Sequence, residues 1–175
     1  GVVGALYEPL FYMNNLKDDP TKLEPLMGKS YTISDDAKTI DVTIRDGEKW
    51  SDGEPYTTED VAYTFNLLNS NKALNTSGFA GSAKVLSDTE VRITLDKPES
   101  VNALSYLSGT MIVPKHVWEK IDDPVTYTNK DAVGSGPFTV KGGNFSPTAY
   151  TFKKNPYYWD EGKPEIDGVR YVLIT

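Results

Sequence analysis

The sequence predicts a mixed α/β protein that combines antiparallel hairpins with short helices. Two stretches alternate apolar and polar residues on either side of a short polar turn, which is typical of β-hairpins with one buried face. A third stretch repeats its apolar residues every three to four positions, as one face of a helix does. The chain has 175 residues, of which 38% are hydrophobic and 11% aromatic, so we expect a globular protein with a real core.

The first hairpin is predicted around the turn-rich pentapeptide at residues 34–38. Ile33 leads into this turn, and after it Ile40, Val42 and Ile44 alternate with polar residues. A period of two places the apolar side chains on one face of a strand. We therefore expect a hairpin whose apolar face is buried.

The next stretch, "KWSDGEPYTTEDVAYTF", predicts a turn and then a helix. Asp52-Gly53 marks a tight turn, and Thr57 followed by Asp60 resembles a capping box. The helix is expected from about residue 58 to 69. The apolar residues of its inward face are Val61, Phe65 and Leu68.

The remaining elements are predicted from turn residues and helix caps. Residues 69–83 are rich in Asn, Ser and Gly and read as a loop, and a second hairpin is expected within residues 84–98. A short helix follows from Ser100, as its N-cap, to Gly109, and another helix has Pro114 as its first position. The strand-like segments of the last third are "PFTVKG", "AYTFKKN" and "VRYVLI".

Composition excludes several classes of function. The formal net charge is −7 and the sequence pI about 4.7, and such an acidic surface repels phosphate backbones, so we expect no nucleic-acid partner. No apolar run reaches the roughly 18 to 20 residues of a membrane span. The chain has no cysteine, and His116 is its only histidine. We therefore expect no disulfide, no metal site and no cofactor.

Five acids near the first helix could supply a catalytic pair of carboxylates. They are Asp46, Asp52, Glu54, Glu59 and Asp60. We favour a structural interpretation, because a turn, a cap and the first turn of a helix all attract acids. His116 has no Ser or Asp partner recognisable by spacing, so a merely positioned or partly exposed histidine is expected there. The residues favour binding over catalysis, and a carboxylate-dependent hydrolase stays the alternative.

Four stretches, in order along the chain, carry a resemblance to a known family. "DDAKTIDVTIRDGEKWSDGEPYTTEDVAYTF" resembles the signature region of the bacterial extracellular solute-binding proteins of family 5, the oligopeptide and dipeptide receptors of ABC importers. "LYEPLFY" (6–12) resembles the early helix of that family, and "IVPKHVWEK" (112–120) its Val-Pro-Lys-His segment. "VGSGPFTVK" (133–141) and "KNPYYWDEGKPEIDGVRYV" (154–172) resemble its Gly-Pro turn and its Asn-Pro-x-Tyr-Trp stretch. The resemblance covers nearly the whole chain.

The resemblance implies the type II fold of periplasmic binding proteins, in which two lobes close on a solute. The implied function is that of the substrate-binding component of an ABC importer, which captures an extracellular solute and delivers it to a membrane permease. An oligopeptide is the favoured solute, and an oligosaccharide or another solute is the alternative; a module that only docks to the permease is a third interpretation. We expect a monomer without catalytic activity, located in the periplasm or outside the cell, and membrane-anchored if it is a lipoprotein.

The resemblance also implies a division of the chain. Members of the family are much longer, so we expect a fragment of the first lobe. Residues 1–9 would begin the main lobe, 10–134 would form an inserted small subdomain, and 135–175 would return to the main lobe. The opening strand, any signal or lipoprotein segment and the second lobe are expected to lie outside this sequence.

The candidate ligand-binding residues follow from their positions in the family pattern. Six of them surround two glycine motifs at lobe junctions, and a seventh lies in the loop after the first helix: Ser108, Gly109, Thr110, Gly134, Ser135, Gly136 and Phe79. Glycines let a ligand or the opposite lobe approach the backbone, and hydroxyls offer adaptable hydrogen bonds. The alternative is that both glycine motifs are only tight turns.

Overall fold

The computed structural model describes residues 2–19, 21–144, 146 and 148–172. Its helices are α1 (Val2–Leu6), α2 (Thr58–Ser70), α3 (Ser100–Gly109) and α4 (Lys115–Trp118). Its strands are β1 (Phe11–Tyr12), β2 (Glu24–Pro25), β3 (Gly28–Ile33), β4 (Thr39–Ile44), β5 (Gly81–Val85), β6 (Glu90–Leu95), β7 (Phe138–Thr139), β8 (Ala149–Lys154) and β9 (Gly168–Val172). The described strands pair antiparallel, so the predicted mixed α/β class with antiparallel hairpins and short helices is confirmed.

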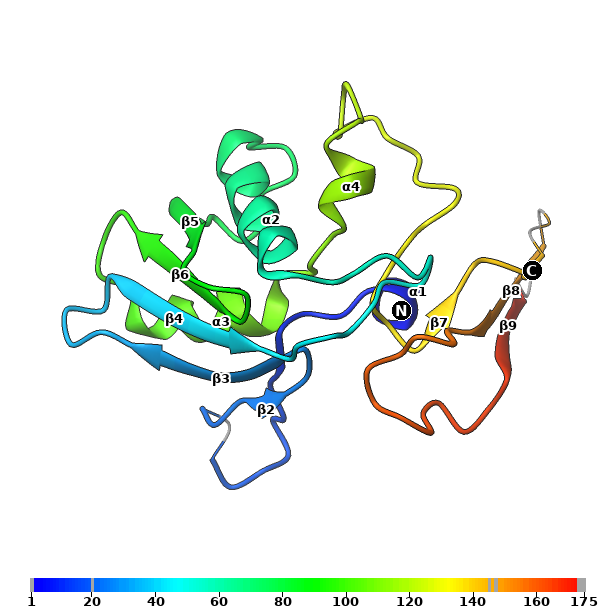
Figure 1. Cartoon of the computed structure of the whole chain (residues 1–175), viewed down its shortest axis with the longest axis horizontal. Coiled ribbons are helices and arrows are strands. Elements are labelled where there is room, and N and C mark those ends of the chain that lie inside the picture. The colour runs from blue at the N-terminus through cyan, green and yellow to red at the C-terminus, as the bar shows by residue number, and fades with distance from the viewer. Residues whose placement is uncertain (1, 20, 145, 147, 173–175) are drawn as a thin grey trace.

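The two predicted hairpins build a four-stranded sheet in the order β3-β4-β6-β5, on which α2 packs (Figure 1). Ile40 lies opposite Ile93 and Val42 opposite Val91, and all four side chains are buried. Residues directly opposite in neighbouring strands share a face, so this face is the core side of the sheet. The predicted helix face is confirmed as well, since Val61 and Phe65 of α2 are fully buried.

The second hairpin starts earlier than predicted. β5 begins at Gly81, inside the stretch 69–83 that was expected to be a loop. A Cβ at Gly81 would lie 2.1 Å from the carbonyl oxygen of Thr94 in β6, so only glycine allows the strands to come this close. Gly81, which reads as a loop residue in the sequence, is therefore required for the close packing of β5 against β6.

The expectation of an early helix over residues 6–12 is wrong. α1 ends at Leu6, and the chain continues in a non-helical conformation to β1. A proline disfavours the helical conformation of the residue before it, and Pro9 places this restriction on Glu8.

Two predicted helix starts are also wrong by one residue. The N-cap of α3 is Glu99 and not Ser100, because the carbonyl oxygen of Glu99 already accepts the first helical hydrogen bond, from the amide of Ala103 (2.9 Å). Pro114 is the N-cap of α4 and not its first helical residue.

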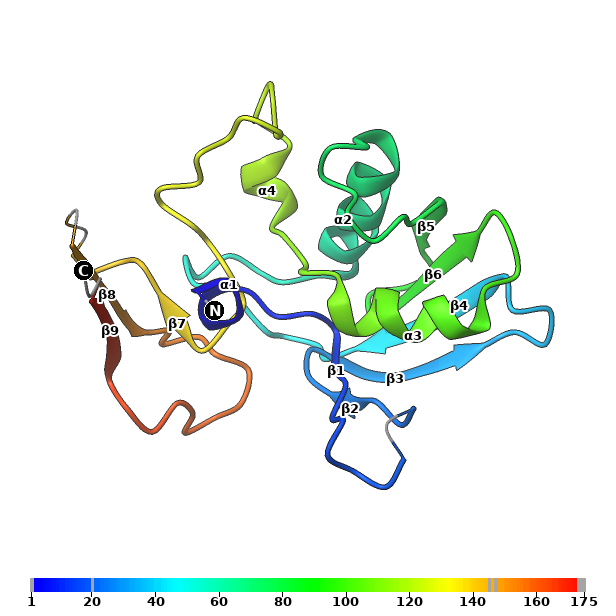
Figure 2. The same cartoon turned by 180° about the vertical axis from the view of Figure 1, so that it is seen from behind.

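Buried apolar side chains form two clusters. The larger joins the four-stranded sheet to α2 and α3, and in it the ring of Phe79 lies edge-on to those of Phe65 and Tyr106. The members of the smaller cluster are Leu6, Tyr7, Ala132, Phe138 and Phe152. Figures 1 and 2 show α1 between the four-stranded sheet and the three-stranded sheet β7-β8-β9. The division at residues 9/10 and 134/135 stays a prediction.

Candidate functional site

The C-terminal end of α3 carries the first group of candidate residues. Ser108 Oγ donates a hydrogen bond to the carbonyl oxygen of Leu104 (2.8 Å), so its proton is used within the helix. Gly109 is exposed, and a Cβ there would meet nothing within 4 Å. Thr110 leaves the helix with a buried side chain, and its hydroxyl finds no hydrogen-bond partner in the described residues. This helix end therefore combines open space with one unsatisfied polar atom.

The second group, Gly134, Ser135 and Gly136, packs against the end of α1. A Cβ at Gly134 would lie 1.8 Å from the carbonyl oxygen of Leu6, and one at Gly136 would lie 2.6 Å from that of Ala5. Contact with α1 therefore requires both glycines. Ser135 between them is 4% exposed, and within the part of the chain that the structure describes its hydroxyl has no partner.

Both groups meet the same short stretch, residues 6–8. The amide of Gly136 donates to the carbonyl oxygen of Leu6 (2.9 Å), and the amide of Ile112 donates to that of Glu8 (3.4 Å). Ile112 follows Thr110 by two residues. The structure thus brings together two segments that are far apart in the sequence, and each carries a buried hydroxyl without a partner.

Phe79 lies apart from these two groups. Its side chain is 2% exposed and is enclosed in the larger core by Phe65 and Tyr106. Tyr106 belongs to the last turns of α3, and its carbonyl oxygen accepts a hydrogen bond from the amide of Thr110 (3.3 Å). Phe79 therefore supports α3 from within the core.

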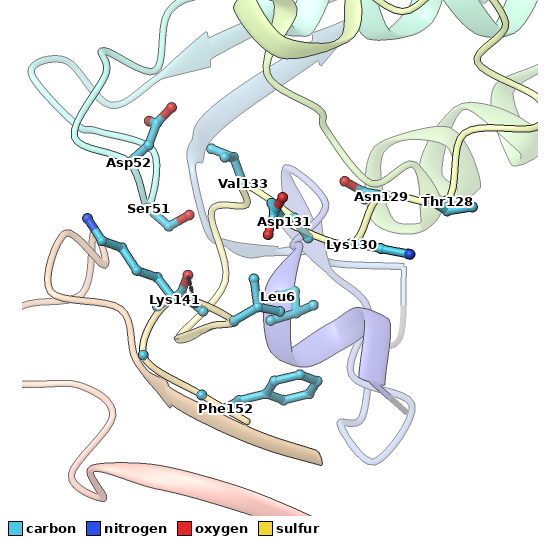
Figure 3. Close-up of a pocket in the computed structure, with 15 residues that line it drawn as sticks. Leu6, Ser51, Asp52, Thr128, Asn129, Lys130, Asp131, Val133, Lys141 and Phe152 are labelled. Carbon is cyan, nitrogen blue, oxygen red and sulfur yellow. Dashed lines mark hydrogen bonds between the residues drawn. The ribbon is translucent and has the colours of Figure 1, made fainter. Parts of the chain in front are cut away.

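A cavity of about 860 Å³, which the sequence did not reveal, lies beside the second group. In Figure 3, Leu6 and Phe152 lie below the charged side chains of Asp131 and Lys141. Residues 128–133 form one wall of it. Residues 128–132 of this stretch show no periodicity and no motif. The one sequence signal among them is Asn129, an asparagine that tolerates its positive φ of 49°.

Ser51 connects this cavity to the turn before the first long helix. Its amide donates to the carbonyl oxygen of Gly134 (3.0 Å), and its Oγ accepts a hydrogen bond from the amide of Gly134 (3.1 Å). The "SDG" turn is therefore fixed to the second glycine motif by a reciprocal pair of hydrogen bonds.

Two of the acids that could have formed a catalytic pair, Asp52 and Asp60, have structural partners. Asp60 is 4% exposed, and its carboxylate accepts hydrogen bonds from Trp50 Nε1 and from the amides of Thr57 and Lys115. Burial raises the pKa of Asp60, although these donors oppose the shift. The carboxylate of Asp52 lies 2.7 Å from His116 Nε2. Sequence spacing could not reveal this partner of His116, because Asp52 lies in a turn 64 residues earlier in the chain.

Two further observations concern the described residues only. They contain no group of three or more His, Cys, Asp or Glu side chains arranged to hold a metal ion. None of the helices formed by them has both the length and the apolar composition needed to cross a membrane.

Comparison with known proteins gives one consistent result. The family model described as bacterial extracellular solute-binding proteins, family 5 middle, matches residues 22–175. The chain is 26% identical to a dipeptide-binding protein of Bacillus subtilis (strain 168), over 100% of this chain and 36% of that protein. It is 33% identical to a peptidoglycan-binding protein of Agrobacterium fabrum, over 97% of this chain and 28% of that protein. The chain thus spans about a third of the length of these relatives.

A solved structure shows the same fold. The mannohexaose-bound oligopeptide ABC transporter, periplasmic oligopeptide-binding protein of Thermotoga maritima matches with a TM-score of 0.82 and 27% identity. The match covers 98% of this chain and 32% of that one. The type II periplasmic-binding-protein fold implied by the sequence resemblance is therefore confirmed for this part of the molecule.

Proposed function

Because the chain belongs to the bacterial extracellular solute-binding proteins of family 5, we propose that it forms part of the first lobe of a receptor for an ABC importer. Members of this family bind peptides or other solutes and work with ABC permeases. The complete receptor captures an extracellular solute, with an oligopeptide as the favoured class, and delivers it to the membrane permease. Its location is periplasmic or extracellular, with a lipid anchor if the protein is a lipoprotein, and it acts as a monomer.

The observation that carries this proposal is that two segments, each with an unpaired, buried hydroxyl, are hydrogen-bonded through their backbones to residues 6–8. A buried hydroxyl without a partner costs roughly 1–3 kcal/mol. The hydroxyls of Thr110 and Ser135 therefore favour any arrangement that supplies a partner. Closure of the receptor on a solute is such an arrangement. It places the solute against the wall formed by residues 6–8, 108–112 and 134–136, where exposed Gly109 leaves room.

The proposed division of labour follows from the layout of the family. Residues 1–9 and 135–175 contribute to the main lobe, residues 10–134 form the inserted subdomain, and a second lobe outside this sequence closes over the solute. A clamp of this kind gains affinity by removing the solute from water between two walls. The present chain supplies one wall.

The favoured solute is supported by the name of one relative, and the alternative by a solved structure. The Bacillus relative is named as a dipeptide-binding protein, whereas the Thermotoga structure contains mannohexaose. A threonine or serine hydroxyl both donates and accepts hydrogen bonds, so it serves peptide amides and sugar hydroxyls equally. An oligosaccharide receptor is therefore the second candidate function.

Thermal-shift screening of the full-length receptor against peptide and oligosaccharide libraries separates these functions. A ligand that binds only the folded state raises Tm. A rise with peptides supports the proposal, and a rise with oligosaccharides alone supports the second candidate. If neither class raises Tm, the receptor function for these solutes is wrong.

Two hydroxyl-deleting variants test the site itself. Thr110→Val and Ser135→Ala each remove a hydroxyl with little change of volume, so we expect each to weaken binding of the stabilising solute about fivefold, as the loss of a hydrogen bond of about 1 kcal/mol does. Isothermal titration calorimetry measures this change. The matched control is Ser70→Ala, which removes an exposed serine hydroxyl at the end of α2 and should leave affinity unchanged.

Unfolding measurements on the same variants provide a second criterion. Because the two hydroxyls are unpaired in the described structure, their removal should not lower the free energy of unfolding. Weaker binding at undiminished stability supports the proposed wall. Undiminished binding in both variants would contradict it.

A further inference from the structure

Glu8 lies between α1 and β1, on the stretch that both groups of candidate residues contact. Its half-buried carboxylate accepts two hydrogen bonds, from Tyr158 Oη to Oε2 (3.0 Å) and from Trp159 Nε1 to Oε1 (3.3 Å). Both partners lie between β8 and β9, at the other end of the sequence. The side chain of Glu8 therefore joins the N-terminal stretch to the C-terminal part of the chain.

The indole of Trp159 is held from a second side. The guanidinium of Arg45, the residue after β4, lies 4.1 Å from the centroid of this ring, which is the geometry of a cation–π contact. Arg45 Nε also donates a hydrogen bond to the carbonyl oxygen of Leu26 (2.6 Å). Arg45 therefore holds Trp159 independently of Glu8, so the indole can position the Glu8 carboxylate.

The backbone of Glu8 connects this support to the proposed wall. Its carbonyl oxygen accepts the hydrogen bond from the amide of Ile112, whose side chain is fully buried. Thr110 lies two residues before Ile112, at the end of α3. One residue thus contacts the Tyr158–Trp159 pair through its side chain and the wall segment through its main chain.

We propose that Glu8 is a positioning residue, which fixes the segment 110–112 of the solute-binding wall because Tyr158 and Trp159 hold its carboxylate in place. The inference rests on the proposed function in so far as this segment faces the solute. Its structural part, the dependence of segment 110–112 on the carboxylate, is tested without any solute.

The electrostatic surroundings of Glu8 make this role measurable. Burial raises the pKa of Glu8, the hydrogen bonds from Tyr158 and Trp159 oppose the shift, and the charge of Asp160 adds to it. Tyr56 is near enough to interact electrostatically with the carboxylate, and the guanidinium of Arg45 lies over the face of the Trp159 ring. A titration of Glu8 should therefore be visible at the indole to which it is hydrogen-bonded.

Two variants separate the carboxylate's hydrogen bonds from its charge. Glu8→Gln keeps an oxygen that accepts from the indole of Trp159, and its amide NH₂ can donate to the Tyr158 hydroxyl, which accepts as well as donates. Glu8→Ala removes both contacts. Glu161→Ala is the matched control, because Glu161 is an exposed acid two residues after Trp159.

Amide hydrogen exchange of Ile112 is the first measurement. We expect Glu8→Ala to accelerate exchange at Ile112 by about tenfold, because a local opening no longer has to break the Glu8 contacts. Glu8→Gln and Glu161→Ala should keep the wild-type rate. An unchanged rate in Glu8→Ala overturns the proposal. If Glu8→Ala does not fold, Tyr158→Phe takes its place with an expected acceleration of about threefold, and an unchanged rate there overturns it too.

The indole N–H resonance of Trp159, followed by NMR against pH, is the second measurement. In the wild type it should shift with a midpoint above the ordinary glutamate pKa of 4.5, and in Glu8→Gln this transition should vanish. The indole of Trp50, which donates to Asp60, is an internal reference that should titrate in both proteins. A Trp159 resonance that does not respond to pH in the wild type contradicts the proposal.

Solute affinity of the full-length receptor completes the test. Glu8→Ala should weaken binding of the stabilising solute about tenfold, as a change of about 1.4 kcal/mol does, and Glu8→Gln should restore it. Faster exchange at Ile112 together with unchanged affinity would show that the positioning has no role in binding, and the proposal would fall. If the wild-type receptor binds no solute, the proposed function fails, while the exchange and NMR data still decide on Glu8.

Discussion

At the scale of single residues, Asp60 carries contacts between three segments of the chain. Its carboxylate accepts hydrogen bonds from Trp50 Nε1 (3.1 Å), the amide of Thr57 (2.8 Å) and the amide of Lys115 (2.8 Å). The bond to Thr57 confirms the predicted cap, whereas the other two reach the preceding turn and the start of α4. The carboxylate that resembled a catalytic acid therefore binds three donors inside the scaffold.

Replacing Asp60 with alanine should lower the free energy of unfolding by about 3 kcal/mol, because three donors lose their acceptor in a buried place. Urea titration followed by circular dichroism measures this loss. Glu59→Ala is the matched control, since Glu59 is exposed and its contact with Lys115 is a long surface ion pair (3.6 Å). Equal stability of the two variants would show that the Asp60 contacts are not structural.

At the scale of elements, α1 packs closely against the second glycine motif because Gly134 and Gly136 have no side chain. The carbonyl oxygens of Ala5 and Leu6 at the end of α1 occupy the positions where Cβ atoms of Gly136 and Gly134 would lie. Neither glycine has the positive φ that would identify a left-handed turn. Their requirement comes from a contact with another element, which explains why a turn motif in the sequence could not reveal it.

Gly134→Ala should destabilise the chain by about 1–3 kcal/mol, the usual cost of overpacking, since the added carbon meets backbone atoms. Gly4→Ala, within α1, is a matched control: a Cβ there meets nothing within 4 Å, and alanine favours the helix by about 1 kcal/mol. Thermal unfolding should therefore move in opposite directions for the two variants. Equal shifts would contradict the close packing described above.

At the scale of the whole molecule, local features could be predicted from the sequence and distant contacts could not. Spacing along the chain determines the turn at residues 34–38, the helix starting at Thr58 and the alternation of β4 and β6. The predictions of these three features are therefore confirmed. Of the site, the sequence placed Thr110 and Ser135 in recognisable motifs, but the backbone contacts of both segments with residues 6–8 depend on tertiary packing. Tertiary packing also determines the contact of Glu8 with Trp159 and the cavity wall at 128–133. No local sequence pattern predicts either of them.

The isolated chain should bind solute far more weakly than the full-length receptor. A single wall leaves the solute largely in water, so most of the binding free energy that closure provides is absent. We expect no measurable rise in Tm of the 175-residue chain at a solute concentration that stabilises the complete receptor clearly. Equal shifts in the two proteins would place the whole binding site within this chain.

The reciprocal hydrogen bonds between Ser51 and Gly134 have a mechanical consequence. They tie the loop after β4 to the glycine motif that packs against α1 at two points, and a joint with two points of attachment resists rotation as well as separation. A force that tilts the sheet is therefore transmitted to the glycine motif. We therefore expect the sheet and the glycine motif around Ser135 to move as one body.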